Sequence, residues 1–388
     1  MRRRLPQDVR FCLFALLAGR VLVSVLAVVG WQLPHDVPEP ATSWNPQAPS
    51  HALFAAFTGL EHYDAAWYLQ LSSHGYHNGD PSSAFFPLYP MLTHVVGVLC
   101  GGRWLLGAYL VTHVSLFVAL VLLYRLTTRE LSESTARWTV VLLLVSPVAF
   151  FLYAPYSESL FLALSLACLT WLRQGRWGPA ASAALLASAT RSTGVVLGAA
   201  MAAQALSDVD WRPHVHHLRT LLPRLVLSTA GVLGTAGYLI YWAARDDWRA
   251  PLDAQSTAFQ REPAWPWLSL VHGLKIAGET ISYPGWLITN LEVALTLVGI
   301  GLGVVVVVRR FAAPYVAMTI TSLVLPLTLA RPFSPLTSVP RYYLVVFPMF
   351  WALAELTRRP AVRVLVLSLS GSLLVLLTLL FSSWHDVL

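Results

Sequence analysis

Long runs of apolar residues, separated by short polar and basic segments, dominate the chain. A helix needs about 20 apolar residues to cross the hydrocarbon core of a bilayer. We therefore interpret nine of these runs as membrane-spanning helices, with approximate bounds 11–31, 104–124, 138–153, 158–173, 222–243, 285–308, 312–330, 341–357 and 364–384. The first run is too long for a signal peptide, so we expect it to be retained. The pattern predicts an all-α polytopic membrane protein in which residues 1–388 form a single integral membrane domain.

Two further apolar regions do not fit a simple crossing. Residues 180–206 are rich in Ala, Gly and Ser and are interrupted by a polar stretch at 191–194. This break predicts a broken or re-entrant pair of short helices that enter and leave on the same side. We expect residues 85–100 to form an interfacial helix, because a crossing there would move Arg125 and Arg129 to the outer side.

Composition supports this interpretation and excludes two other classes of protein. The chain is 56% hydrophobic and 12% charged, and its mean hydropathy is +0.61. These values exclude a soluble globular protein and an intrinsically disordered one. The net charge is +7, and all basic residues except Lys275 are arginines. They lie at the ends of apolar runs rather than along one polar face, so they indicate membrane orientation and not nucleic-acid binding.

The distribution of these arginines predicts which loops face outward. With the N-terminus in the cytoplasm, 17 of the 26 basic residues lie inside, seven lie outside, and Arg20 and Arg191 lie at membrane depth. Three outer loops result, at 32–103, 244–284 and 331–341. The cytoplasmic connections are short and basic. We therefore expect the functional site on the outer face, with interfacial helices in the first outer loop.

Asp64 is the main candidate for catalysis in the first outer loop. If a helix starts at Ala65 and ends at Gly75, Asp64 is its N-cap, a position that strongly favours aspartate. Alternatively, Asp64 is a general base at the membrane boundary, where partial desolvation and nearby donors set its pKa. The two roles are compatible, because a capped carboxylate is also rigidly positioned.

Aromatic residues flank Asp64 on both sides. In the expected helix, Trp67, Tyr68 and Leu71 share one face, which we place toward the membrane. The motif FFPLYP that follows is typical of an aromatic belt at the headgroup level, and direct ligand contact is the alternative. The candidate sugar- and lipid-binding residues of this loop are His62, Tyr63, Trp67, Tyr68, Phe86 and Tyr89.

A second polar segment, SPVAFFLYAPYSESLF, occupies residues 146–161. Here Pro155 ends one span, Ser157 can cap the next helix, and Glu158 complements the dipole of its first turn. The same arrangement places Tyr156, Ser157 and Glu158 at the outer face beside the first loop. We therefore keep these three residues as candidate binding residues.

Three arginines are candidates for binding a phosphate. Arg191 is costly at membrane depth and lies at a helix break, where its guanidinium and free backbone N–H groups suit an anion. The alternative is a structural ion pair with Glu158 or Glu292. Arg331 and Arg341 flank the proline-rich third outer loop and bind either a phosphate or membrane headgroups.

These motifs together resemble the GPI mannosyltransferase II (PIG-V) family and its bacterial relatives, which are glycosyltransferases of the GT-C fold. The resemblance in order and spacing covers roughly residues 10–200. It is carried by LEHYDAAWYLQLSSHGY through SAFFPLYP at 60–90, SPVAFFLYAPYSESLF at 146–161, ATRSTGV at 189–195 and PRYYLVVFP at 340–348.

The resemblance implies a catalytic aspartate early in the first outer loop, which falls on Asp64. It also implies a donor of mannose carried on a polyprenyl or dolichyl phosphate, and an inverting transfer. The sequence departs from the family where many relatives have Trp before the aspartate and this chain has Tyr63, and residues 254–261 match only loosely. Abundant Ala and Arg with almost no lysine suggest a GC-rich bacterial genome, so we expect an integral protein of a bacterial plasma membrane.

We therefore expect a mannosyltransferase in which Asp64 deprotonates an acceptor hydroxyl and arginines at 191, 331 and 341 bind the leaving lipid phosphate. The expected partners are polyprenyl-phosphate-mannose, a glycolipid or lipid-linked acceptor, and the bilayer. No cofactor is expected. A divalent metal at Glu158 is compatible with this chemistry but is not required. The alternatives are a GT-C transferase for another lipid-linked sugar, such as arabinose or glucose, and a lipid-linked sugar transporter or flippase.

Overall fold

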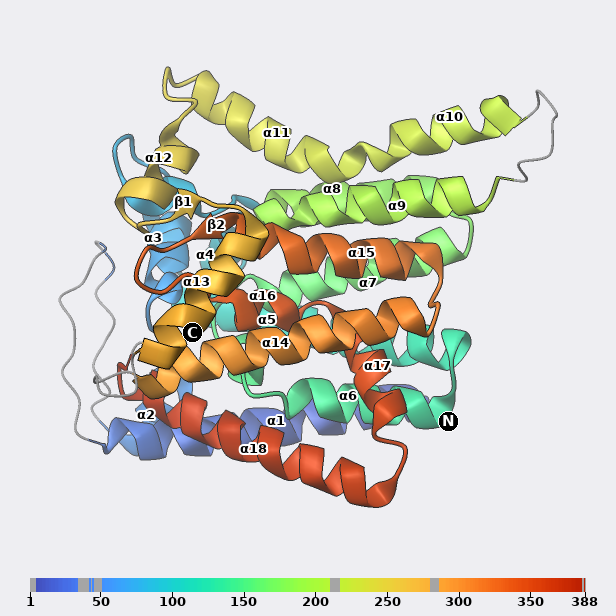
Figure 1. Cartoon of the computed structure of the whole chain (residues 1–388). Helices are drawn as coiled ribbons and strands as arrows, with labels where there is room; N and C mark the ends of the chain where they lie inside the picture. The colour runs from blue at the N-terminus through green and yellow to red at the C-terminus, as the bar shows by residue number, and fades with distance from the viewer. Residues whose placement is uncertain are drawn as a thin grey trace, which may run out of the picture. The chain divides into compact units, whose positions relative to one another are not determined.

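The computed structural model describes residues 5–33, 42, 44, 51–209, 217–279, 286–385 and 387, and it is mainly helical (Figure 1). Parts of the first two predicted outer loops, 34–41, 43, 45–50 and 280–284, lie outside the described residues. Among the described residues, five helices are long and apolar enough to cross a bilayer. These are α1 (Gln7–Trp31), α5 (Trp104–Glu130), a continuous span at Arg219–Ala243 made by α10 (His217–Ser228) and α11 (Ala230–Ala243), α14 (Trp286–Val308) and α18 (Pro360–Ser382).

The other four predicted spans contain shorter helices. They correspond to α6 (Glu133–Leu144) with η2 (Ala149–Leu152), α7 (Glu158–Arg173), α15 (Ala313–Val324) with η5 (Leu325–Thr328), and α16 (Val339–Leu344) with α17 (Phe347–Leu356). The predicted all-α polytopic fold is confirmed, whereas the number of nine full spans stays a prediction. In two of these spans a proline lies at the interruption, because proline cannot continue a helical hydrogen-bond ladder: Pro326 lies where α15 changes to η5, and Pro348 lies at the start of α17.

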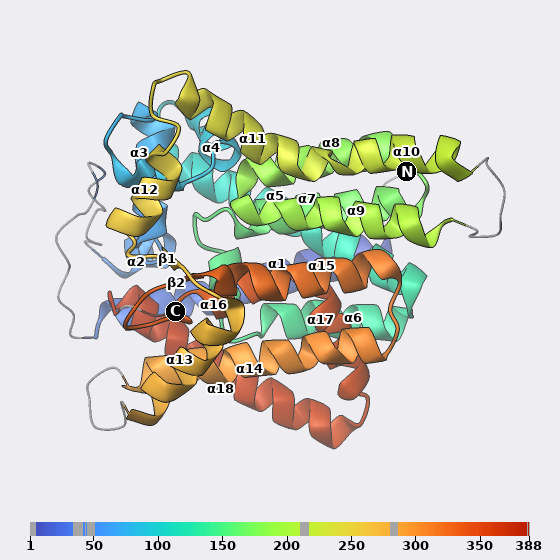
Figure 2. The same ribbon diagram turned by 45° about the horizontal axis from the view of Figure 1, so that its top comes forward.

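The two irregular regions form the short helices that the sequence predicts. Residues 180–206 become α8 (Trp177–Thr190), η3 (Ser192–Gly194) and α9 (Val195–Ser207), and Arg191 at the break is extended, with φ −154° and ψ 147°. From this break α9 runs back in the opposite direction to α8 (Figures 1 and 2). Helix α4 (Leu88–Leu99) has 12 residues, too few to span a bilayer. Its placement at the interface stays a prediction.

The chain divides into two compact units, each built from separate stretches of sequence. Unit 1 takes residues up to 76, 89–163 and 353–387. Within it α1 packs against α2 (Ala52–Thr58), α5 and α18, so the first and last long helices lie side by side (Figure 1). Gly30 permits this approach, because a Cβ there would lie 2.0 Å from the Ser382 hydroxyl oxygen.

Unit 2 takes residues 77–88 and 164–352. Helix α11 lies along α8 and also contacts α9 (Figures 1 and 2). Glycine at the contact lets the backbones meet, because a Cβ on Gly234 would lie 2.4 Å from the carbonyl oxygen of Leu185. The Gly234 N–H donates to the Ser188 hydroxyl at 3.0 Å. This hydrogen bond holds α11 against the end of α8, three residues before the break at Arg191.

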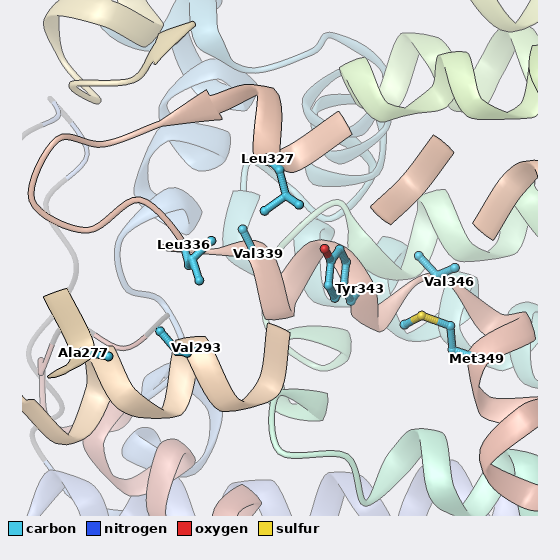
Figure 3. Close-up of a cluster of buried hydrophobic side chains, with 8 residues drawn as sticks. All are labelled: Ala277, Val293, Leu327, Leu336, Val339, Tyr343, Val346 and Met349. Atoms are coloured by element: carbon cyan, nitrogen blue, oxygen red, sulfur yellow. The ribbon is translucent and has the colours of Figure 1, made fainter. Parts of the chain in front are cut away.

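A buried apolar cluster holds α16 in unit 2 (Figure 3). Its members come from α13 (Pro266–Glu279), α14, η5, the 331–338 segment, α16 and α17: Ala277, Val293, Leu327, Leu336, Val339, Tyr343, Val346 and Met349. The Tyr343 hydroxyl donates to the carbonyl of Leu323 at 3.0 Å. Since Arg341 and Tyr342 belong to the same short helix, this cluster also fixes their backbone.

A two-stranded antiparallel sheet in unit 2 joins the second predicted outer loop to the end of the predicted span 312–330, directly before the third outer loop. Strand β1 (Glu262–Pro263) pairs with β2 (Leu329–Ala330), with Glu262 opposite Ala330. The Ala264 N–H extends the contact by donating to the carbonyl of Thr328 at 2.9 Å. Backbone hydrogen bonds therefore hold together two segments, 262–264 and 328–330, that are far apart in sequence.

Candidate functional site

Asp64 is the first residue of α3 (Asp64–His74) in unit 1. Its predicted role as the N-cap is wrong by one residue, because Tyr63 takes the cap position with φ 53° and ψ −116°. The turn that starts the helix forms on residues 62 and 63, whose carbonyls accept from the N–H groups of Ala65 and Ala66 at 3.1 and 3.0 Å. The half-buried Asp64 carboxylate therefore lies in the first turn, where the helix dipole stabilises negative charge. The predicted end of the helix at Gly75 is confirmed.

The predicted membrane-facing stripe on α3 is wrong. Trp67, Tyr68 and Leu71 are buried inside unit 1, with exposed fractions of 7%, 5% and 6%. The Tyr68 hydroxyl lies 2.8 Å from the Ser157 hydroxyl, and the Tyr68 ring packs edge-on against Tyr89 with centroids 4.9 Å apart. In a membrane protein an apolar face can contact lipid or protein, and on α3 protein covers it.

The second motif lies directly against the first, as the sequence predicts. The Tyr156 hydroxyl donates to the carbonyl of His62 at 2.8 Å. Glu158 is the first residue of α7 and is fully buried, and Ser157 precedes it. Unit 1 therefore gathers Asp64 with the polar and aromatic candidates of both motifs: His62, Tyr63, Trp67, Tyr68, Tyr89, Tyr156, Ser157 and Glu158. Phe86 belongs to unit 2, where its ring packs on Tyr238 with centroids 4.9 Å apart.

Glu61 is a buried carboxyl three residues before Asp64 that the sequence does not single out as a candidate. Its side chain is 2% exposed and accepts a hydrogen bond from the indole N–H of Trp44. Burial raises the pKa of Glu61 to about 7, against the lowering effect of that hydrogen bond. Glu61 is therefore held in its neutral form in the folded protein at acidic pH.

This raised pKa predicts that stability falls as pH rises. The folded state holds the Glu61 proton up to about pH 7, whereas the unfolded chain releases it near 4.5. Unfolding therefore becomes easier between these values, by up to about 3 kcal/mol. Thermal unfolding in detergent from pH 4.5 to 8 should show a midpoint that declines less in Glu61→Gln than in the native protein. Glu279→Gln, on the exposed end of α13, is the control, and identical profiles for Glu61→Gln and the native protein would contradict the assignment.

Unit 2 brings two of the three predicted phosphate ligands together around Tyr342. The guanidinium carbon of Arg191 lies 5.0 Å from the centre of the Tyr342 ring. Arg341 is adjacent in sequence and buried. A third arginine, Arg261, donates to the Tyr342 hydroxyl at 3.0 Å. The positive charges of all three arginines act on this tyrosine. These three arginines and Tyr342 form what we call the arginine cluster.

Arg331, the third predicted phosphate ligand, is held beside the arginine cluster by a separate hydrogen bond. Its Nε donates to the carbonyl of Phe259 at 2.9 Å. Arg261 precedes β1 and Arg331 follows β2, so the antiparallel register places them at the next facing positions. The sequence does not single out Arg261 as a candidate, because its position depends on the pairing of two distant segments, β1 and β2. Tyr342, by contrast, lies in the PRYY motif at 340–343, so the sequence indicates its neighbourhood.

Among the described residues, no group of three or more His, Cys, Asp or Glu side chains is arranged to hold a metal ion. The expectation about metal therefore stays a prediction. The chemical groups available are a carboxylate at a helix start in unit 1 and an arginine cluster in unit 2. The first suits proton transfer and the second suits an anion.

Comparison with known families identifies the group to which this chain belongs. The model of the mannosyltransferase (PIG-V) family matches residues 17–216, which is more than half of the chain and includes both Asp64 and Arg191. The chain belongs to the PIG-V mannosyltransferase family. The predicted resemblance is therefore confirmed, and it places the chain in a family of membrane glycosyltransferases.

Individual proteins are similar to this chain in sequence or in fold. The human GPI alpha-1,6-mannosyltransferase 2 is 30% identical over 151 residues, which cover 36% of this chain and 30% of the human protein. ArnT from Cupriavidus metallidurans, solved with bound undecaprenyl phosphate, aligns over 89% of this chain and 60% of its own, with a TM-score of 0.50 and 16% identity. An oligosaccharyltransferase from Archaeoglobus fulgidus aligns over 96% and 53%, with a TM-score of 0.47 and 12% identity. The predicted GT-C fold is confirmed, and the chain covers less than two thirds of these relatives.

Proposed function

We propose that this protein is a membrane mannosyltransferase that moves mannose from a lipid-phosphate-linked donor to a hydroxyl of a glycolipid or lipid-linked acceptor. The observation that carries the proposal is the membership of this family, in a chain whose unit 1 has Asp64 at the start of α3 and whose unit 2 has the arginine cluster. The family name supports mannose as the sugar. The undecaprenyl phosphate bound to ArnT supports a polyprenyl phosphate carrier.

In this proposal Asp64 is the general base. Its carboxylate takes the proton of the acceptor hydroxyl as that oxygen forms a bond with the anomeric carbon of mannose. The bond between the anomeric carbon and the phosphate oxygen breaks on the opposite face, so the configuration inverts. The electron pair leaves with the lipid phosphate. No exchange of electrons with a redox cofactor is required.

The arginine cluster stabilises the leaving phosphate in this proposal. Guanidinium groups form charge-assisted, often bidentate hydrogen bonds to phosphate oxygens. Arg191, Arg261 and Arg341 bring three positive charges to one tyrosine ring, so an anion is the ligand that this region favours. Arg331 lies at the edge and contributes to the same positive field.

The aromatic and polar residues next to Asp64 then shape the sugar and acceptor surfaces. Tyr68, Tyr89 and Tyr156 are held in place within unit 1, because each hydroxyl forms a hydrogen bond there. We place the active site on the outer face of a bacterial plasma membrane, with the N-terminus in the cytoplasm. The arginine distribution along the sequence supports this orientation.

A transfer assay tests the function. Membranes that overproduce the protein should convert labelled polyprenyl-phosphate-mannose into a new labelled lipid, and membranes with Asp64→Asn should not. Polyprenyl-phosphate-linked glucose and arabinose should label that product at least tenfold less. Movement of the labelled donor across liposomes without a new glycosidic bond would support the transporter alternative instead. Preference for another sugar would keep the transferase and replace mannose.

A further inference from the structure

The end of α18 contacts the loop that precedes Asp64. The His62 ring stacks on the Trp384 indole, with centroids 3.6 Å apart and planes 23° from parallel. The Nδ1 of His62 also lies 2.9 Å from the carbonyl oxygen of Phe381, and only the ring nitrogen can donate in that pair. His62 and Phe381 are 319 positions apart in the sequence. His62 is 4% exposed, so protein surrounds its ring.

Tyr63 forms the second connection to the same segment. Its hydroxyl donates to the carbonyl of Trp384 at 2.7 Å. Its backbone has φ 53°, which a tyrosine adopts only when the surroundings fix it. Tyr63 directly precedes Asp64 in the chain. Its backbone conformation therefore sets the direction of the first turn of α3, which carries the Asp64 carboxylate.

Phe381 extends the contact to the second motif. Its ring lies 5.0 Å from Phe150, 5.5 Å from Phe151 and 6.3 Å from Tyr156, centroid to centroid. Tyr156 in turn donates to the carbonyl of His62 at 2.8 Å. The segment 381–384 therefore contacts both motifs of unit 1, although it lies well beyond the region that the family model matches.

We propose that Trp384 is a positioning residue for Asp64, acting through His62 and Tyr63 with Phe381 as its support. This inference rests on the proposed role of Asp64 as general base. A base must lie within hydrogen-bond reach of the proton it takes, and a displacement of about 1 Å can reduce a rate about 100-fold. The Trp384 ring stacks on His62, and the Trp384 carbonyl accepts a hydrogen bond from Tyr63. Trp384 therefore helps to fix the position of the Asp64 carboxylate.

The test compares purified full-length variants in the transfer assay. Trp384→Ala should lower kcat about 10- to 100-fold and leave the KM for polyprenyl-phosphate-mannose within about twofold. Trp384→Phe should recover most of the rate, because a flat ring can still stack on His62. His385→Ala is the matched control, since this neighbouring side chain is exposed and contacts Ser383.

Tyr63→Phe gives an independent measurement that keeps the ring and removes only the hydrogen bond to Trp384. It should lower kcat about 3- to 10-fold with an unchanged donor KM. If Trp384→Ala does not fold, this variant decides the question, because a normal kcat overturns the proposal. If Asp64→Asn is inactive while Trp384→Ala and Tyr63→Phe turn over normally, the positioning role is wrong. If Asp64→Asn itself turns over normally, the proposed role of Asp64 fails instead.

Discussion

Replacing Asp64 with asparagine should lower kcat for mannose transfer by about 10²- to 10⁴-fold, because the amide cannot accept the proton of the acceptor hydroxyl. The asparagine side chain has nearly the same shape as that of aspartate, so the donor KM should change little. The loss of a negative charge in the first turn of α3 costs only about 0.3–1 kcal/mol. The thermal unfolding midpoint should therefore stay within a few degrees of the native value.

The matched control for this variant is Asp80→Asn. Asp80 also starts a helical turn, because its side chain accepts from the N–H of Ser82 as the cap of η1 (Pro81–Ala84). Asp80 has no role in the proposed chemistry, so the kcat of Asp80→Asn should remain near the native value. Equal turnover of Asp64→Asn and the native protein, measured with purified donor, would show that another group removes the proton.

Replacing Arg191 with alanine should lower kcat/KM for the donor about 10- to 100-fold, since one charge-assisted contact to a phosphate is worth about 1.5–3 kcal/mol. Arg191→Lys keeps the charge and loses the bidentate geometry, so its kcat/KM should lie between the values of Arg191→Ala and the native protein. Polyprenyl phosphate without a sugar should also inhibit Arg191→Ala less strongly than the native protein, because the cluster would bind the product phosphate as well.

The control for Arg191 is another arginine of unit 2 that stacks on a tyrosine. The guanidinium of Arg245 lies 4.9 Å from the centre of the Tyr241 ring, and the residue is exposed. Arg245→Ala should leave kcat/KM and product inhibition near their native values. Equal effects of the two substitutions would indicate a general loss of positive charge, and would contradict a specific phosphate site at Arg191.

Local features of the site could be predicted from the sequence because they depend on neighbouring residues. The break at Arg191 follows from Ser192, Thr193 and Gly194 between two Ala-rich stretches, and the structure places it there. The end of α3 follows from Gly75, which takes φ 78°. The choice of Asp64 as the base, by contrast, came from its motif and stays a prediction.

Features of the site that depend on contacts between residues far apart in the chain could not be predicted from the sequence. The face of α3 that carries Trp67 and Tyr68 is apolar in either environment, so the pattern alone did not distinguish lipid from protein. Arg261 joins the cluster only because β1 pairs with β2. The stacking of Trp384 on His62 requires α18 to return beside α1, and no local sequence signal indicates this.

The arginine cluster combines residues from two sides of the boundary at which the family match ends. Arg191 lies within the matched residues 17–216, whereas Arg261 and Arg341 lie beyond them. The proposed base therefore belongs to the shared part of the family, and most of the anion-binding groups belong to the part that the family model does not cover. A match to residues 17–216 alone therefore does not establish that a sequence carries the arginines equivalent to Arg261 and Arg341, so the proposed phosphate site has to be checked residue by residue.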